Sequence, residues 1–136
     1  MKISTKGRYA LRVMADIALN SDEKKISITE LAERNNISDK YLEQIISLLV
    51  KQNLLVSFRG SQGGYKLSRP ASEITIGDII SSTEGNLETV SCVSGNEKCD
   101  MAGSCLTANV WAKLDKIVND FFNSTTLDDV INKRIN

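Results

Sequence analysis

The apolar residues in the first half of the chain recur at the spacing of α-helices. Over residues 6–20 they fall at three- and four-residue steps, which predicts one amphipathic helix with a single buried stripe. A second, shorter helix is predicted to follow Ser27, because a serine cap with Glu30 three positions later matches a capping box. The asparagine pair at 35–36 is expected to end this helix in a polar turn.

The third predicted helix begins with Ser38 as its cap and continues to about Gln52. One stripe is apolar, at positions i, i+3, i+4 and i+7, and contains Leu42, Ile45, Ile46 and Leu49. The opposite face is polar and contains Lys40, Gln44, Ser47 and Lys51, with Tyr41 and Glu43 beside it near the start of the helix. Such a face is typical either of a helix exposed to water or of the second helix of a helix-turn-helix, here about 20 Å long and able to lie in a DNA major groove.

A β-hairpin is predicted directly after this helix. Residues 54–59 and 65–69 are predicted to be its strands, and the glycine-rich residues 60–64 supply the backbone freedom of the turn. A hairpin in this place is the wing of a winged helix, and its tip carries Arg59 and Gln62. Any hairpin needs a turn, but the order of helix pair, polar-faced helix and basic wing favours DNA binding, with the arginine suited to a minor-groove or phosphate contact.

The second half of the chain is predicted to contain three more helices. A capping-box pattern over residues 75–78 opens a short helix that stops near Gly85, and another over 126–129 caps the last helix. Between them a long helix runs to about Asn123, with one apolar face made of Val110, Leu114, Ile117, Val118 and Phe121 and broadened by Trp111 and Phe122. This face either folds back on its own domain or packs against a second copy; we favour the second, a twofold homodimer.

These elements predict a mainly α-helical fold with a small β-hairpin, in which a winged helix-turn-helix domain is joined to a long dimerisation helix. Three parts are expected: a DNA-binding domain over residues 1–85, a cysteine-bearing loop over residues 86–106, and the dimerisation and C-terminal helices over residues 107–136.

Charge is unevenly distributed along the chain, although its 17 basic and 17 acidic residues balance. Up to Pro70 there are twelve lysines and arginines against seven acidic residues, and from Ala71 onward five against ten, so the first half is the candidate for a polyanionic partner. The absence of histidine removes the usual general base and argues against an enzyme. No stretch approaches the roughly 20 apolar residues of a membrane span and no secretory signal is apparent, so we expect a cytoplasmic protein without membrane contact.

The three cysteines of the chain, Cys92, Cys99 and Cys105, lie within fourteen positions of a polar segment. In a reducing compartment this odd number does not indicate a disulfide framework, whereas clustered thiolates suit a soft metal or an iron–sulfur cluster. The spacing is not the Cys-x-x-Cys of a zinc ribbon. A structural zinc site and three ordinary free thiols remain the alternatives.

Four motifs resemble a known family over nearly the whole chain. They are K-I-S-T-K-G-R-Y-A at residues 2–10, I-S-D-K-Y-L-E-Q at 37–44, R-G-S-Q-G-G-Y at 59–65 and C-L-T at 105–107. Together with the cysteine loop ahead of a long helix, they resemble the winged-helix regulators of the Rrf2 family, whose branches include IscR, NsrR and CymR, and the IscR branch most closely. The resemblance implies that the three cysteines ligate an iron–sulfur cluster, of the 2Fe–2S type in the IscR branch.

The resemblance also bears on DNA binding. Lys40, Tyr41, Glu43 and Gln44 fall where the recognition helix of the family meets DNA, and Arg59 matches its wing arginine. With the neighbours that share the polar helix face and the wing tip, the candidate DNA-binding residues are Ser38, Lys40, Tyr41, Glu43, Gln44, Ser47, Lys51, Arg59 and Gln62.

The sequence departs from the family pattern at the fourth cluster ligand. The IscR-type histidine, three residues after the last cysteine, is replaced by Ala108, and the acidic ligand of NsrR-like members is replaced by Arg8. Asp100, Glu97, a small thiol or solvent could complete the site, and the spacing favours none of them. The fourth ligand therefore stays open, and so does a thiol sensor without a cluster.

The leading hypothesis is a homodimeric regulator, most simply a repressor, that binds double-stranded DNA and controls genes of iron–sulfur cluster assembly or sulfur metabolism through a cluster. Iron–sulfur assembly or cysteine-synthesis proteins are conceivable partners. The alternatives are a CymR-like repressor of cysteine metabolism that acts without a cluster, and a winged-helix module that binds a protein.

Overall fold

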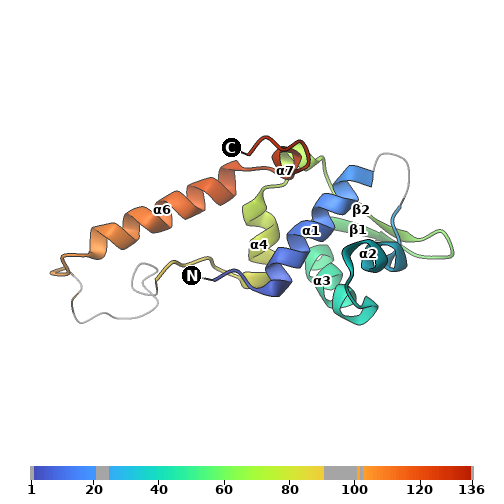
Figure 1. Ribbon diagram of the computed structural model, residues 1–136, viewed down its shortest axis with the longest axis horizontal. Coiled ribbons are helices and arrows are strands. Elements are labelled where there is room, and N and C mark those ends of the chain that lie inside the picture. Colours follow the sequence, from blue (N-terminus) through green and yellow to red (C-terminus); the bar gives the residue numbers. More distant parts are fainter. Residues whose placement is uncertain (1, 21–24, 91–100, 102, 136) are drawn as a thin grey trace.

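The computed structural model describes residues 2–20, 25–90, 101 and 103–135 (Figure 1). The helices that precede the cysteine segment, the hairpin and the short last helix gather into one winged domain. The long helix over residues 108–124 projects away from this domain and meets it near the C-terminal end of that helix. In the described part of the chain, no helix is both long and apolar enough to cross a membrane.

Asp16 of α1 (Thr5–Asn20) bonds to two side chains of α2 (Ile28–Asn35) and so connects the two helices. The Asp16 carboxylate accepts a 2.9 Å hydrogen bond from the Asn35 side-chain amide and forms a 2.7 Å ion pair with Arg34. Ser27 caps α2 by accepting from the Glu30 amide at 3.2 Å, which is one half of the predicted capping box. Asn36 is the C-cap of this helix, and its φ of 53° is a left-handed conformation that asparagine tolerates better than most residues.

Helix α3 (Asp39–Lys51) has Ser38 as its N-cap, and the hydroxyl of this serine accepts from the Tyr41 amide at 3.2 Å. Its predicted apolar stripe, Leu42, Ile45, Ile46 and Leu49, is buried. The stripe packs in one core with the buried side of α1, formed by Ala10, Val13, Met14 and Ile17. Burial of these two stripes fixes which side of α3 remains in solvent.

The hairpin consists of β1 (Leu55–Phe58) and β2 (Gly64–Leu67), which pair antiparallel with Leu55 opposite Leu67. Ile26 adds an isolated bridge to Tyr65 on the other edge of β2, with backbone hydrogen bonds of 2.9 and 3.2 Å. A Cβ at Gly64 would lie 2.7 Å from the Ile26 carbonyl oxygen, so only glycine permits this approach.

After the 3₁₀ turn η1 (Ala71–Glu73), α4 (Ile76–Glu84) begins with the predicted capping box between Thr75 and Asp78. Thr125 is the C-cap of helix α6 (Ala108–Ser124), and α7 (Leu127–Ile131) begins with the second predicted capping box, between Thr126 and Asp129. Leu127 is fully buried in the core of the winged domain. The chain therefore returns to this domain after α6.

Candidate DNA-binding surface and cysteine segment

The solvent side of α3 carries the polar residues that the sequence singles out. Exposed side chains run along the helix at Ser38, Lys40, Glu43, Gln44, Ser47 and Lys51. Tyr41 differs from them, because it is half-buried and its ring packs edge-on against Tyr9, with the ring centroids 6.1 Å apart. The structure therefore gives Tyr41 a packing role that leaves only part of its surface available to a ligand.

The tip of the hairpin exposes Arg59 and Gln62 on a backbone with little steric bulk. The Gly63 amide donates to the Gly60 carbonyl at 2.9 Å and closes the turn. A Cβ at Gly63 would lie 2.3 Å from the Phe58 carbonyl oxygen, so a side chain cannot be placed there without opening the turn. Glycine at position 63 is therefore required for the turn that presents Arg59 and Gln62.

A groove separates α3 from the hairpin. It has a volume of about 230 Å³, and Glu43 and Ser47 of α3 face Ser57 and Tyr65 of the strands across it. Acceptors and donors from two elements thus line a cleft next to the exposed face of α3. Sequence reasoning places Glu43 and Ser47 on the helix, but it does not bring the strand residues to the same cleft.

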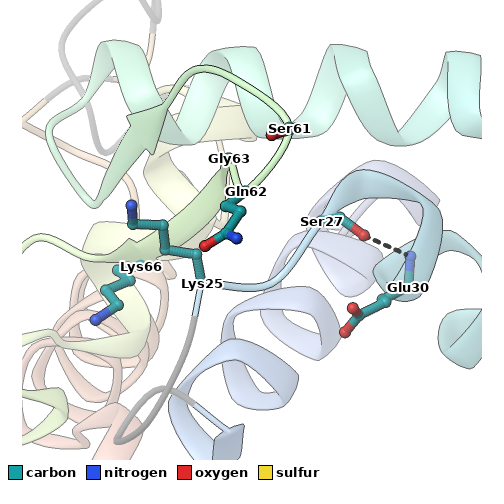
Figure 2. Close-up of a pocket in the computed structure, with 7 residues that line it drawn as sticks. All are labelled: Lys25, Ser27, Glu30, Ser61, Gln62, Gly63 and Lys66. Atoms are coloured by element: carbon teal, nitrogen blue, oxygen red, sulfur yellow. Dashed lines mark hydrogen bonds between the residues drawn. The ribbon is translucent and has the colours of Figure 1, made fainter.

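A second hollow, of about 510 Å³, lies between the hairpin tip and the start of α2. Figure 2 shows its lining residues, which are Lys25, Ser27, Glu30, Ser61, Gln62, Gly63 and Lys66. The amines of Lys25 and Lys66 point in different directions, and the Lys25 amine lies 4.3 Å from the centre of the Phe58 ring. The two lysines add positive charge beside the wing, which sequence reasoning missed although both flank the Ile26–Tyr65 pair.

Of the three cysteines, only Cys105 belongs to the described residues; Cys92 and Cys99 lie outside them, as do the candidate ligands Glu97 and Asp100. Cys105 is a partly exposed residue, and its sulfur lies 3.3 Å from the Thr107 hydroxyl. Hydrogen bonding from the Thr107 side chain, followed by its backbone amide, lowers the pKa of the Cys105 thiol below its usual value. Because the thiolate is the form that binds metals, this environment suits Cys105 as a ligand.

The two positions that depart from the family pattern are both exposed. Ala108 is the first residue of α6, and Arg8 donates to the Thr5 hydroxyl within α1 at 3.2 Å. Neither offers a metal-binding atom.

Helix α6 has an outer stripe of apolar residues and an inner stripe in which apolar and polar residues are mixed. The outer stripe is exposed and consists of Val110, Leu114, Ile117 and Phe121, with exposed fractions between 42 and 57%. The inner stripe is half-buried and consists of Trp111, Asp115, Val118, Asn119 and Phe122. Val118 belongs to this inner stripe rather than to the outer face on which the sequence pattern placed it.

Comparison with known proteins gives the family. The model of the Rrf2 family, described as iron-dependent transcriptional regulators, matches residues 3–133. The HTH-type transcriptional regulator IscR of Pectobacterium atrosepticum is 40% identical over 134 residues, which are 98% of this chain and 81% of that protein. The chain belongs to the Rrf2 family of transcriptional regulators.

Solved structures agree with this assignment. The chain is similar to CymR (YrzC), the global cysteine regulator of B. subtilis, with 36% identity and a TM-score of 0.84 over 98% of both chains. It is also similar to T. potens IscR, with 38% identity and a TM-score of 0.79 over 99% of this chain and 89% of that one. These likenesses confirm the expected family, the winged-helix fold and a regulator rather than an enzyme.

Proposed function

We propose that this regulator binds operator DNA as a homodimer and responds to an iron–sulfur cluster held by its three cysteines. The observation that carries the DNA-binding part is the exposed polar face of α3, which lies beside a hairpin with a basic, glycine-rich tip. Residues 1–85 are the proposed DNA-binding domain and residues 86–106 the proposed sensing loop. Residues 107–136 contain the proposed dimerisation helix α6 and the C-terminal helix α7, whose Leu127 packs in the core of the winged domain. Binding chromosomal DNA implies action in the cytoplasm.

In this proposal α3 lies in the major groove. Gln44 can read adenine through its amide, and Glu43 can accept from cytosine N4 while repelling phosphates, so that it rejects some sequences as well as selecting others. Ser38, Lys40, Tyr41, Ser47 and Lys51 supply the surrounding contacts. At the wing, Arg59 and Gln62 contact the adjacent minor groove or its phosphates.

The outer stripe of α6 supports the homodimer. Its four large apolar side chains are exposed along one side of a 17-residue helix. Burying the exposed half of each side chain would contribute roughly 0.8–1.5 kcal/mol, since full burial of such a side chain is worth about 1.5–3 kcal/mol. A twofold axis through this stripe would pair two copies of the same surface and set two winged domains at a fixed separation.

Cys92, Cys99 and Cys105 are the proposed cluster ligands, and the lowered pKa and accessibility of Cys105 fit that role. When bound, a 2Fe–2S cluster supplies redox- and iron-dependent chemistry that thiols alone lack. The protein's part is to present thiolates and to couple the position of residues 86–106 to the winged domains. The resemblance to IscR proteins supports cluster-assembly or sulfur-metabolism genes as targets, with repression as the simplest mode.

A second candidate is favoured by Ala108, which replaces the IscR-type histidine, and by the likeness to CymR. In it the cysteines sense as thiols, or a cysteine-synthesis protein binds the regulator, and no cluster forms.

The DNA-binding part is tested by selecting ligands for the full chain from random duplexes and titrating salt against the selected sequence. We expect log affinity to fall against log salt with a slope of about −4 or steeper, because several phosphate contacts per dimer each contribute about −0.9. A flat salt response together with no enriched sequence would contradict DNA binding and favour a module that binds a protein.

A further inference from the structure

The C-terminal end of α6 is joined firmly to the winged domain. The Ile76 amide donates to the Thr125 carbonyl at 2.9 Å, and the Leu127 amide donates to the Ile74 carbonyl at 2.8 Å. Next to this junction a Cβ at Gly77 would lie 2.5 Å from the Asn123 side-chain oxygen, so α4 and α6 are in close contact here. A junction at one end of a helix fixes that end, but by itself it lets the helix pivot.

A second attachment lies in the middle of α6, at Asp115. Its Oδ1 accepts a hydrogen bond from the Thr89 amide at 3.2 Å and lies 3.4 Å from the Thr89 hydroxyl. Thr89 is only 8% exposed and belongs to the segment that leaves α4. The contact therefore joins α6 to the chain 26 positions earlier, on the inner stripe.

The side chain of Asp115 is itself held in place. The Asn119 amide nitrogen donates to Asp115 Oδ2 at 3.2 Å and to the Asp115 carbonyl oxygen at 2.9 Å. One turn away in the other direction lies Trp111, the single tryptophan of the chain, half-buried on the same stripe. A charged acceptor with a fixed rotamer makes a stronger and more directional contact than a mobile surface side chain.

We infer that Asp115 is a positioning residue that sets the direction of α6 relative to its winged domain, and with it the spacing of DNA half-sites that the dimer prefers. Asp115 precedes Thr125 by ten residues, or about 15 Å along the helix, and two attachments so far apart define an axis. Successive base pairs are only about 3.4 Å apart, so a small change in this direction alters the preferred spacing. The inference rests on the proposed DNA-binding homodimer.

Two substitutions at Asp115 and one control test the inference. Asp115→Ala removes the contact with Thr89, whereas Asp115→Asn keeps an oxygen that can accept from the Thr89 amide. Asp120→Ala is the matched control, because Asp120 lies on the same helix, is exposed and pairs with Lys116 instead. Thermal unfolding of each variant checks that the fold is retained.

The first measurement is Trp111 fluorescence. In Asp115→Ala we expect emission to shift to longer wavelength as the inner stripe opens, with no shift in Asp120→Ala and little in Asp115→Asn. The second measurement uses the duplex selected by the unmodified protein, rebuilt with its central spacer one or two base pairs longer or shorter. We expect the unmodified protein to prefer its own spacing by about 10-fold or more and Asp115→Ala to lose most of that preference, with Asp115→Asn restoring it.

The outcomes separate the inference from the proposed function. If Asp115→Ala folds, dimerises and binds DNA with undiminished spacing preference, Asp115 does not position α6. If the unmodified protein neither dimerises nor selects DNA, the proposed function fails. In that case the fluorescence alone decides whether Asp115 holds α6, and an unshifted Asp115→Ala spectrum would refute that as well.

Discussion

Replacing Asp16 by alanine should destabilise the joint between α1 and α2 by about 2–3 kcal/mol. The Asp16 side chain is 14% exposed and accepts from Asn35, which is itself 6% exposed, so this charged hydrogen bond should contribute roughly 1.5–3 kcal/mol. The ion pair with Arg34 adds at most about 1 kcal/mol, because that arginine is 40% exposed. Alanine has a higher helix propensity than aspartate within α1, and this offsets about 0.5 kcal/mol of the lost stability.

The assay is urea unfolding followed by circular dichroism at one fixed protein concentration, since a dimer makes stability concentration-dependent. We expect the midpoint to fall by about 1–2 M in Asp16→Ala. Asp120→Ala is the matched control, because its partner Lys116 is 67% exposed and the pair should contribute less than about 0.5 kcal/mol. Equal midpoints for the two variants would refute the view that Asp16 holds the helix-turn-helix against α1.

The other predictions concern the DNA surface, the outer stripe and the thiol. Arg59→Ala should weaken operator binding by about 1–3 kcal/mol in gel-shift titrations, and Gln44→Ala should also change the selected sequence; uniform loss across sequences for Gln44→Ala would contradict base reading. Ile117→Glu should yield monomers in analytical ultracentrifugation, because it places a charge in the proposed interface. A dimer mass in this variant would show that the dimer contact lies elsewhere. The thiol is tested in a variant whose other two cysteines are replaced by serine. In that background Thr107→Val should raise the pKa of Cys105, so the alkylation rate of Cys105 should rise at higher pH than in the same background with Thr107. Coincident pH profiles would show that the Thr107 hydroxyl does not stabilise the thiolate.

The local pattern of the sequence predicts most of the secondary structure correctly. The capping residues Ser38, Thr75 and Thr126 all begin helices where expected, because a cap and the residue three positions later act within one turn. The hairpin strands differ from expectation by one or two residues at their ends. Element type and approximate position therefore follow from short-range chemistry.

Contacts between distant segments could not be predicted in this way. The Asp16–Asn35 hydrogen bond, the Ile26–Tyr65 bridge and the Thr89–Asp115 contact each join residues whose sequence neighbourhoods give no sign of the partner. Tyr41 shows the same limit at the candidate site, since helical spacing marks it as near the polar face while its ring packs on Tyr9. The polar face of α3 was predictable because burial of the opposite stripe defines it; the groove beside it needs the fold.

The coupling of cysteine ligation to DNA binding is the central claim, and it is tested most directly on protein purified without oxygen. Iron and sulfide are counted per chain, and affinity for the selected duplex is measured before and after the iron is removed by a chelator, in the unmodified protein and in a variant with serine at positions 92, 99 and 105. We predict about two iron and two sulfide per chain and an affinity that changes on iron removal, with neither in the serine variant. The claim would be contradicted if the unmodified protein held a stoichiometric cluster and yet all four samples had the same affinity and the same sequence choice.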